Sequence, residues 1–124
     1  MALSNGLGQD DVLWEVIRPY MEELSEQTGE TVLLATPYGN NIIYREAAYP
    51  NHAISVRAIK GVVAPMYCTS LGKAILSCME PDYTERVISE GMKAFTPYTI
   101  TDPQAFREEI QKIRMQGYSV DNME

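Results

Sequence analysis

Helix signals and strand signals occupy separate stretches of this chain, which limits the folds that it can adopt. Apolar residues recur every three or four positions over residues 13–24, a spacing that predicts an amphipathic helix. β-Branched and other apolar residues then dominate 31–36 and 42–47, and both segments are predicted strands. Turn-forming residues fill 37–41 between them, so the two strands are expected to form a hairpin.

The rest of the chain predicts one more strand followed by helices. Apolar and polar residues alternate over Ala53–Ala58, which predicts a third strand, and Lys60–Pro65 is a predicted loop. Three helices are expected next, the last beginning near Thr101 and ending at Gly117, and a further strand is expected to begin at Tyr118. Because strands and helices are segregated, the sequence predicts an α+β fold, with an antiparallel sheet and helices packed against it.

Helix starts and buried faces can be predicted as well. Asp10 or Asp11 is expected to cap the first helix, and Thr101 and Gln104 have capping-box spacing at the start of the last one. The residues expected on inner faces share a spacing of three or four positions. They are Leu13, Ile17, Met21 and Leu24 in the first helix, Leu71, Ile75 and Cys78 in the second, and Phe106, Ile110 and Ile113 in the last.

Charge and cysteine content restrict the function and the compartment. The chain has a formal charge of −7, so it is not expected to hold nucleic acid or an anionic membrane by itself, since both need clustered Lys and Arg. No apolar run approaches the ~20 residues that span a bilayer. Cys68 and Cys78 would lie roughly 15 Å apart on one helix, too far for a disulfide. Both are therefore expected to be reduced thiols in a cytoplasmic protein.

The run from Tyr67 to Leu76 is the segment most suggestive of a binding site. It is predicted to be a loop that turns into a helix, with hydroxyl side chains at the helix start. First-turn N–H groups lack helical partners, so such a start can hold a small anion. Alternatively, the hydroxyl of Thr69 or Ser70 only caps the helix, and the two roles are compatible.

Four phrases in order resemble the effector-binding domain of the IclR family of bacterial transcriptional regulators. Thr28–Val32 resembles the junction of its first helix and strand, and Ala64–Ala74 resembles its loop-to-helix motif. Phe95–Asp102 and Ile113–Asp121 resemble the entry to and the exit from its long helix. The resemblance implies a GAF/profilin-like fold that is incomplete at the C-terminus. It also implies a domain over residues 11–124, after a start at 1–10 that is disordered or was added for expression.

The family's winged helix-turn-helix, which reads DNA, has no counterpart before Asp10, and the later sheet strands have none after Glu124. DNA contact is therefore expected only through a missing N-terminal domain. A strand starting at Tyr118 would also lack its neighbour in sequence. An isolated segment is accordingly expected to exchange strands in a homo-oligomer, to be partly disordered, or to aggregate.

The resemblance also implies the site and its partner, a small organic acid or a sugar-derived metabolite. Ser70 and Leu71 correspond to positions whose backbone groups hold the ligand, and Asp121 to a carboxylate that accepts hydrogen bonds from a ligand hydroxyl. Val56 and Ala64 correspond to apolar walls of the pocket. Without the resemblance, Asp121 would be a solvated carboxylate and the two apolar residues ordinary core.

Other functions are weighed against this one. A module that dimerises through its open sheet without binding a metabolite is the main alternative. A thiol enzyme using Cys68 would need a base, and no spacing brings His52, the single histidine, to that position. Lys73 is expected on the helix surface. No metal site or cofactor is predicted, because one histidine and two cysteines ten positions apart do not make a ligand set.

Overall fold

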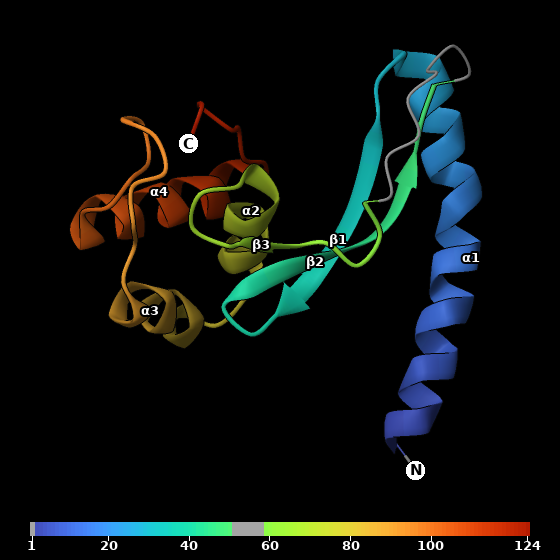
Figure 1. The fold of residues 1–124 in the computed structure, drawn as a ribbon, viewed down its shortest axis with the longest axis horizontal. Coiled ribbons are helices and arrows are strands. Elements are labelled where there is room, and N and C mark those ends of the chain that lie inside the picture. Colours follow the sequence, from blue (N-terminus) through green and yellow to red (C-terminus); the bar gives the residue numbers. More distant parts are fainter. Residues whose placement is uncertain (1, 51–58) are drawn as a thin grey trace. The chain divides into compact units, whose positions relative to one another are not determined.

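A computed structural model describes residues 2–50 and 59–124, which form four helices and a three-stranded sheet (Figure 1). The strands lie in the order β1-β2-β3, with β2 in the middle. The predicted α+β class is confirmed. The predicted strand at 53–58, which includes Val56, lies outside the described residues.

The chain divides into two compact units, and the first contains residues 1–35 and 44–62. Helix α1 runs over Ala2–Thr28 and ends where Gly29 adopts a positive φ of 72°, as its position predicts. The helix begins well before Asp10, so the prediction that Asp10 or Asp11 caps its start is wrong. An acidic N-cap signal is also compatible with the interior of a helix that starts earlier.

Strands β1, over Val32–Tyr38, and β2, over Asn41–Ala48, form the predicted hairpin. The strands reach further than expected, and only two residues turn the chain, with Gly39 at a φ of 61°. In the first unit the Glu46 carboxylate is buried and takes ion pairs from Arg18 at 2.5 Å and from Lys60 at 3.0 Å. This pairing neutralises a charge that burial would otherwise disfavour.

The second unit contains residues 36–43 and 63–124. Here Val63–Pro65 forms β3 and pairs antiparallel with β2, placing Ala64 opposite Ile42. The prediction of a loop over Lys60–Pro65 is therefore wrong at its C-terminal end. Three residues are too short a segment for an alternation signal, and pairing with the buried Ile42 decides their conformation.

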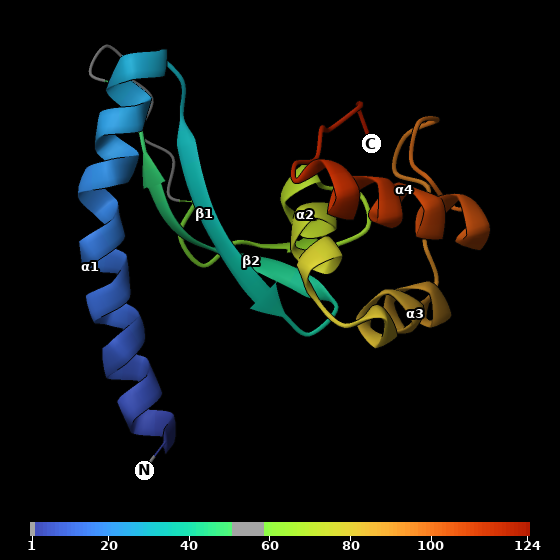
Figure 2. The ribbon, with the colours of Figure 1, turned by 180° about the vertical axis from the view of Figure 1, so that it is seen from behind.

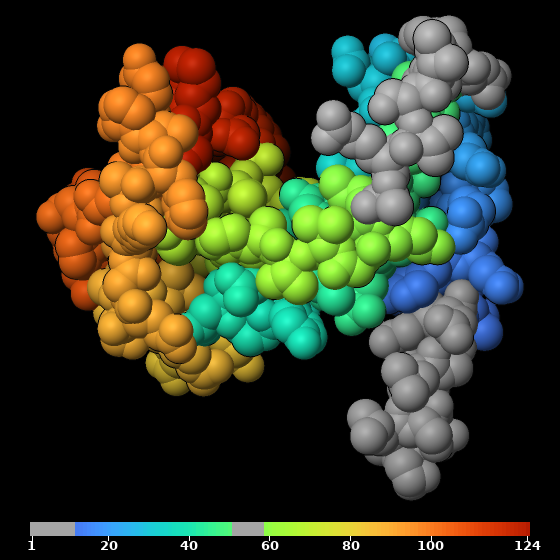
Figure 3. All heavy atoms as spheres, viewed as in Figure 1, coloured from blue at the N-terminus to red at the C-terminus, as the bar shows by residue number. Residues whose placement is uncertain are grey.

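Three helices complete the second unit: α2 over Ser70–Cys78, α3 over Pro81–Glu90 and α4 over Pro103–Gln116. Helix α4 lies along α2 and also contacts α3 (Figure 2). Most of the connection 91–102 lies at the surface (Figure 3), while Thr99 within it is buried. Gly91 and Gly117 end α3 and α4 with positive φ angles, and Gly117 is the predicted end of the last helix.

The buried faces agree with prediction in α4 and differ in the other two helices. Phe106, Ile110 and Ile113 are all buried, as their spacing predicts. Helix α2 instead buries Gly72, Lys73, Leu76 and Ser77, while Cys78 is exposed. In α1, Met21 is buried but Leu13 and Leu24 are about half exposed. These faces were mispredicted because apolar side chains occur on more than one face of both helices, so periodicity alone does not choose a face.

The start of α4 and the segment after it also differ from prediction. Asp102, and not Thr101, is the N-cap, and its side chain accepts a hydrogen bond from the Ala105 amide at 2.8 Å. Pro103 occupies the first turn, as expected. Within the described residues, no strand begins at Tyr118, because no neighbouring strand pairs with that segment.

The two candidate caps of α4 can be separated by mutation. We expect Asp102→Ala to lower the free energy of unfolding by about 1 kcal/mol, because the Ala105 amide loses its acceptor. Thr101→Ala is the matched control and should change stability by much less. Urea unfolding followed by circular dichroism measures both. Equal losses from the two variants would contradict the assigned cap.

Candidate functional site

The site is built on the close approach of the loop 66–69 to the first turn of α2. A Cβ atom at Gly72 would lie 2.4 Å from the Met66 carbonyl oxygen and 2.7 Å from Thr69 Oγ1. Only glycine leaves room for this approach. Met66, Tyr67 and Cys68 are buried, so packing against neighbouring residues holds the loop in place.

Thr69 caps α2, as one of the two sequence interpretations expects. Its hydroxyl donates to the Pro65 carbonyl at 2.9 Å and accepts from the Gly72 amide at 3.1 Å, while the Lys73 amide donates to the Thr69 carbonyl. Within the described residues, the amides of Ser70 and Leu71 have no such acceptor. The first turn of α2 thus keeps two free donors at the positive end of the helix dipole.

Lys73 is the main residue whose role the sequence did not predict. Its side chain is completely buried, and its ammonium pairs with Glu109 of α4 at 3.1 Å and with Glu124. The prediction of a surface lysine is therefore wrong. Lys73 and Leu76 lie three positions apart on one helix face, and this spacing was the sequence signal that could have placed Lys73 on the buried face.

Glu124 holds the segment after α4 against the rest of the second unit. Its side chain is 3% exposed, and its backbone carbonyl accepts from the Thr99 hydroxyl at 2.8 Å. The Thr96 hydroxyl donates to the Met123 carbonyl at 2.6 Å. The Glu124 amide in turn donates to Asp121 Oδ1 at 3.1 Å. These contacts hold Asp121 near α2 even though its own side chain is exposed to solvent.

The environment of Cys68 argues against a reactive thiol. Burial raises the pKa of Cys68 above its ordinary value, and the charges of Glu124 and Asp121 raise it further. The thiol therefore stays protonated near neutral pH, whereas a nucleophile must be a thiolate.

Tyr67 ties that loop to the surface connection 91–102. Its hydroxyl donates to the Lys93 carbonyl at 2.8 Å and accepts from the Lys93 amide at 3.0 Å. The Tyr67 ring also stacks on Phe95, with centroids 6.0 Å apart. Burial raises the pKa of Tyr67, so the hydroxyl remains a neutral donor.

The predicted site residues lie on one continuous segment and on the segment that folds back toward it. Ala64 lies in β3 and is partly exposed, Ser70 and Leu71 form the start of α2, and Asp121 follows α4. Val56 lies outside the described residues. An opening of about 320 Å³ borders Glu124 and Glu109, but its lining includes neither Ser70 nor Asp121.

The described part of the chain shows neither a metal site nor a membrane-spanning helix. No group of three or more His, Cys, Asp or Glu side chains there could hold a metal ion. None of the helices described combines the length and hydropathy needed to cross a bilayer.

Comparisons with known proteins agree on one family. The family described as bacterial transcriptional regulator IclR C-terminal matches residues 8–124. The HTH-type transcriptional regulator BhcR of Paracoccus denitrificans is 33% identical over 113 residues, which are 90% of this chain and 40% of that protein. The chain therefore spans about two fifths of the length of this curated relative.

Solved structures give the same assignment. The crystal structure of the IclR protein of Thermotoga maritima matches with a TM-score of 0.80 and 29% identity, covering 90% of this chain and 45% of that one. An IclR homologue from Microbacterium hydrocarbonoxydans matches with a TM-score of 0.78 and 28% identity, covering 88% and 45% of the two chains. The latter structure is a complex with 4-hydroxybenzoate.

The two cysteines provide an internal comparison of thiol reactivity. We expect iodoacetamide to label Cys78, which is exposed, much faster than Cys68 at neutral pH. Because its pKa is raised, labelling of Cys68 should increase only as the pH rises above the ordinary range of a cysteine. Peptide mass spectrometry follows both sites, and unfolding in urea should equalise them. Faster labelling of native Cys68 at neutral pH would contradict this environment.

Proposed function

Because the chain belongs to the family of IclR C-terminal domains of bacterial transcriptional regulators, we propose that it is the ligand-sensing domain of such a regulator. Its ligand is a small organic acid or a sugar-derived metabolite. Binding is relayed to a winged helix-turn-helix elsewhere in the regulator, which contacts DNA in the cytoplasm. The charge of −7 supports the assignment of DNA binding to another domain, since nucleic acid would repel this chain.

The free donors at the start of α2 are the observation that carries the proposal. The amides of Ser70 and Leu71 lie in the first turn, next to the Thr69 cap and the tightly packed Gly72. A carboxylate placed there accepts two charge-assisted hydrogen bonds and interacts favourably with the helix dipole. The rigid loop 66–69 keeps both donors in place before the ligand arrives, which lowers the entropic cost of binding.

The other proposed contacts take the remainder of the ligand. Asp121 accepts a hydrogen bond from a ligand hydroxyl, and Ala64 and Val56 contact its apolar part. The 4-hydroxybenzoate in the Microbacterium homologue has a carboxylate, a hydroxyl and an apolar ring, so a ligand of that kind would use all three types of contact.

Signalling requires that the ligand favour one arrangement of the domain over another. A ligand shifts such an equilibrium only by its difference in affinity for the two states. The segment 121–124 is the part of the proposed site best suited to this role. It contacts α2 and the connection 91–102 of the same unit through the Lys73 ion pair and hydrogen bonds, and a ligand held by Asp121 would add to those contacts.

A second candidate function is dimerisation without a ligand, and α1 supports it. Large apolar side chains that remain about half exposed or more lie along this helix at spacings of three to four residues. They are Val12, Leu13, Val16, Tyr20 and Leu24. A helix with such a row buries it favourably against another helix. Homo-oligomer formation is also compatible with ligand sensing.

The Ser70 amide donor can be tested on its own. Ser70 is the first residue of α2, a position where proline is well tolerated. The backbone of Thr69 is extended, which is the conformation that a residue before proline requires. We expect Ser70→Pro to keep the fold and to weaken binding of 4-hydroxybenzoate at least about tenfold, because one charge-assisted hydrogen bond is lost. Ser70→Ala keeps the amide and should bind like the parent. Isothermal titration calorimetry measures all three.

Further probes separate the two functions. The neutral analogue 4-hydroxybenzamide should bind more weakly than 4-hydroxybenzoate, and gluconate and glucose test for a sugar-derived ligand. Equal binding by Ser70→Pro and Ser70→Ala would contradict the role of the amide. If no probe stabilises the protein while light scattering shows a dimer that Val16→Glu dissociates, the second candidate function holds instead.

A further inference from the structure

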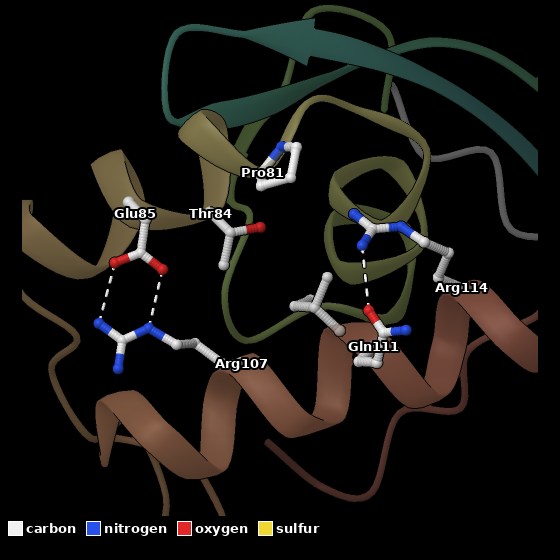
Figure 4. Close-up of a pocket in the computed structure, with 7 residues that line it drawn as sticks. Pro81, Thr84, Glu85, Arg107, Gln111 and Arg114 are labelled. Carbon is white, nitrogen blue, oxygen red and sulfur yellow. Dashed lines mark hydrogen bonds and ion pairs between the residues drawn. The ribbon is translucent and has the colours of Figure 1, made fainter.

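A pocket of about 250 Å³ lies between α3 and α4, in a part of the second unit that the proposed sensing function does not use (Figure 4). Pro81 of α3 and Ile110 of α4 supply its apolar walls. The polar groups come from side chains of both helices. The pocket shares no lining residue with the turn that contains Ser70 and Leu71.

Thr84 supplies the most informative group in this pocket. The residue is 5% exposed, and within the described part of the chain its Oγ1 has no hydrogen-bond partner. Figure 4 shows this oxygen directed into the pocket, between Pro81 and Gln111 and away from the Glu85–Arg107 pair. A buried hydroxyl without a partner costs roughly 1–3 kcal/mol. An acceptor bound in the pocket would remove that cost.

Two arginines line the pocket, and only one of them keeps a charge that no carboxylate offsets. Arg107 is held by both oxygens of Glu85, at 2.7 and 2.9 Å, so these two charges offset each other. Arg114 has no carboxylate partner among the described residues. Its Nε donates to the Ser77 carbonyl, and its two terminal nitrogens donate to Gln111 and to the Met79 carbonyl. Since a guanidinium has five N–H groups, one hydrogen on each terminal nitrogen remains available.

The start of α3 adds little positive charge to the pocket. Pro81 is in the first turn of this ten-residue helix, and its N-cap Glu80 makes no side-chain capping bond. The acidic residue Asp82 lies in the same turn and offsets the positive end of the α3 dipole. Arg114 and the Thr84 hydroxyl are therefore the groups that favour an acceptor carrying negative charge.

We propose that the pocket between α3 and α4 binds a small monocarboxylate with an apolar body. The carboxylate accepts from the Thr84 hydroxyl and from Arg114, and the apolar body contacts Ile110 and Pro81. A phosphate dianion fits less well, because one uncompensated arginine does not balance two charges and the Glu85 carboxylate also lines the pocket. The inference does not depend on the sensing function at α2.

The test uses the whole 124-residue chain labelled with nitrogen-15 and titrated with sodium benzoate. We expect saturable shifts of the Thr84 and Gln111 amide signals. Thr84→Val removes only the hydroxyl and keeps the side-chain shape, so benzoate affinity should fall at least about tenfold. Thr84→Ser keeps a hydroxyl and should stay within about threefold of the parent. The melting temperature of Thr84→Val without ligand should be unchanged or higher, because an unpaired buried hydroxyl is gone.

Several results would overturn the inference. Benzoate shifts confined to Ser70 and Leu71 would place the carboxylate at α2 only, supporting the sensing function and removing this second site. If Thr84→Val binds benzoate as tightly as the parent, or if the Thr84 signal shows no saturable shift, the proposed pocket does not bind a carboxylate. Equal binding of benzyl alcohol, or tighter binding of inorganic phosphate at the same signals, would contradict the assigned ligand class.

Discussion

The buried ammonium of Lys73 is the constraint on which the second unit depends. A lysine without solvent contact must be paired, and here Glu109 of α4 and Glu124 supply the opposite charges. The three residues join α2, α4 and the segment after α4 at one point. Apolar packing of Phe106 and Ile110 brings the helices together but does not set their register, because it has no direction. The charge cluster supplies that direction.

The proposed sensing site follows from this arrangement. Lys73 is the fourth residue of α2, so its position also fixes the turn that carries the free amides of Ser70 and Leu71. Gly72 lets the preceding loop close on the same turn. Glu124 then returns the chain toward α2 and, through its amide, holds Asp121. A ligand bridging the helix start and Asp121 would therefore contact two elements that the same buried charge connects.

Sequence reasoning succeeded where one residue type has one strong preference. The end of α4 at Gly117 was predictable because glycine readily adopts the positive φ of a helix end. The inner face of α4 was predictable because mostly polar residues fill the remainder of that helix. The inner face of α2 was not predictable, since its apolar side chains do not mark a single face and a buried lysine is an exception to the usual exposure of charged residues. The Lys73 cluster depends on residues 36 and 51 positions away, a distance at which local patterns carry no information. The family, in contrast, was evident from four short phrases in order.

Urea unfolding of a double-mutant cycle at Lys73 and Glu124 tests the central claim most directly. Lys73→Met leaves two carboxylates without their cation, and the account predicts a loss of about 3–5 kcal/mol of unfolding free energy. Adding Glu124→Gln should then cost much less than it does alone, with a coupling of about 1–3 kcal/mol. Lys73→Met within about 0.5 kcal/mol of the parent, as for a surface residue, or additive effects of the two substitutions, would contradict it.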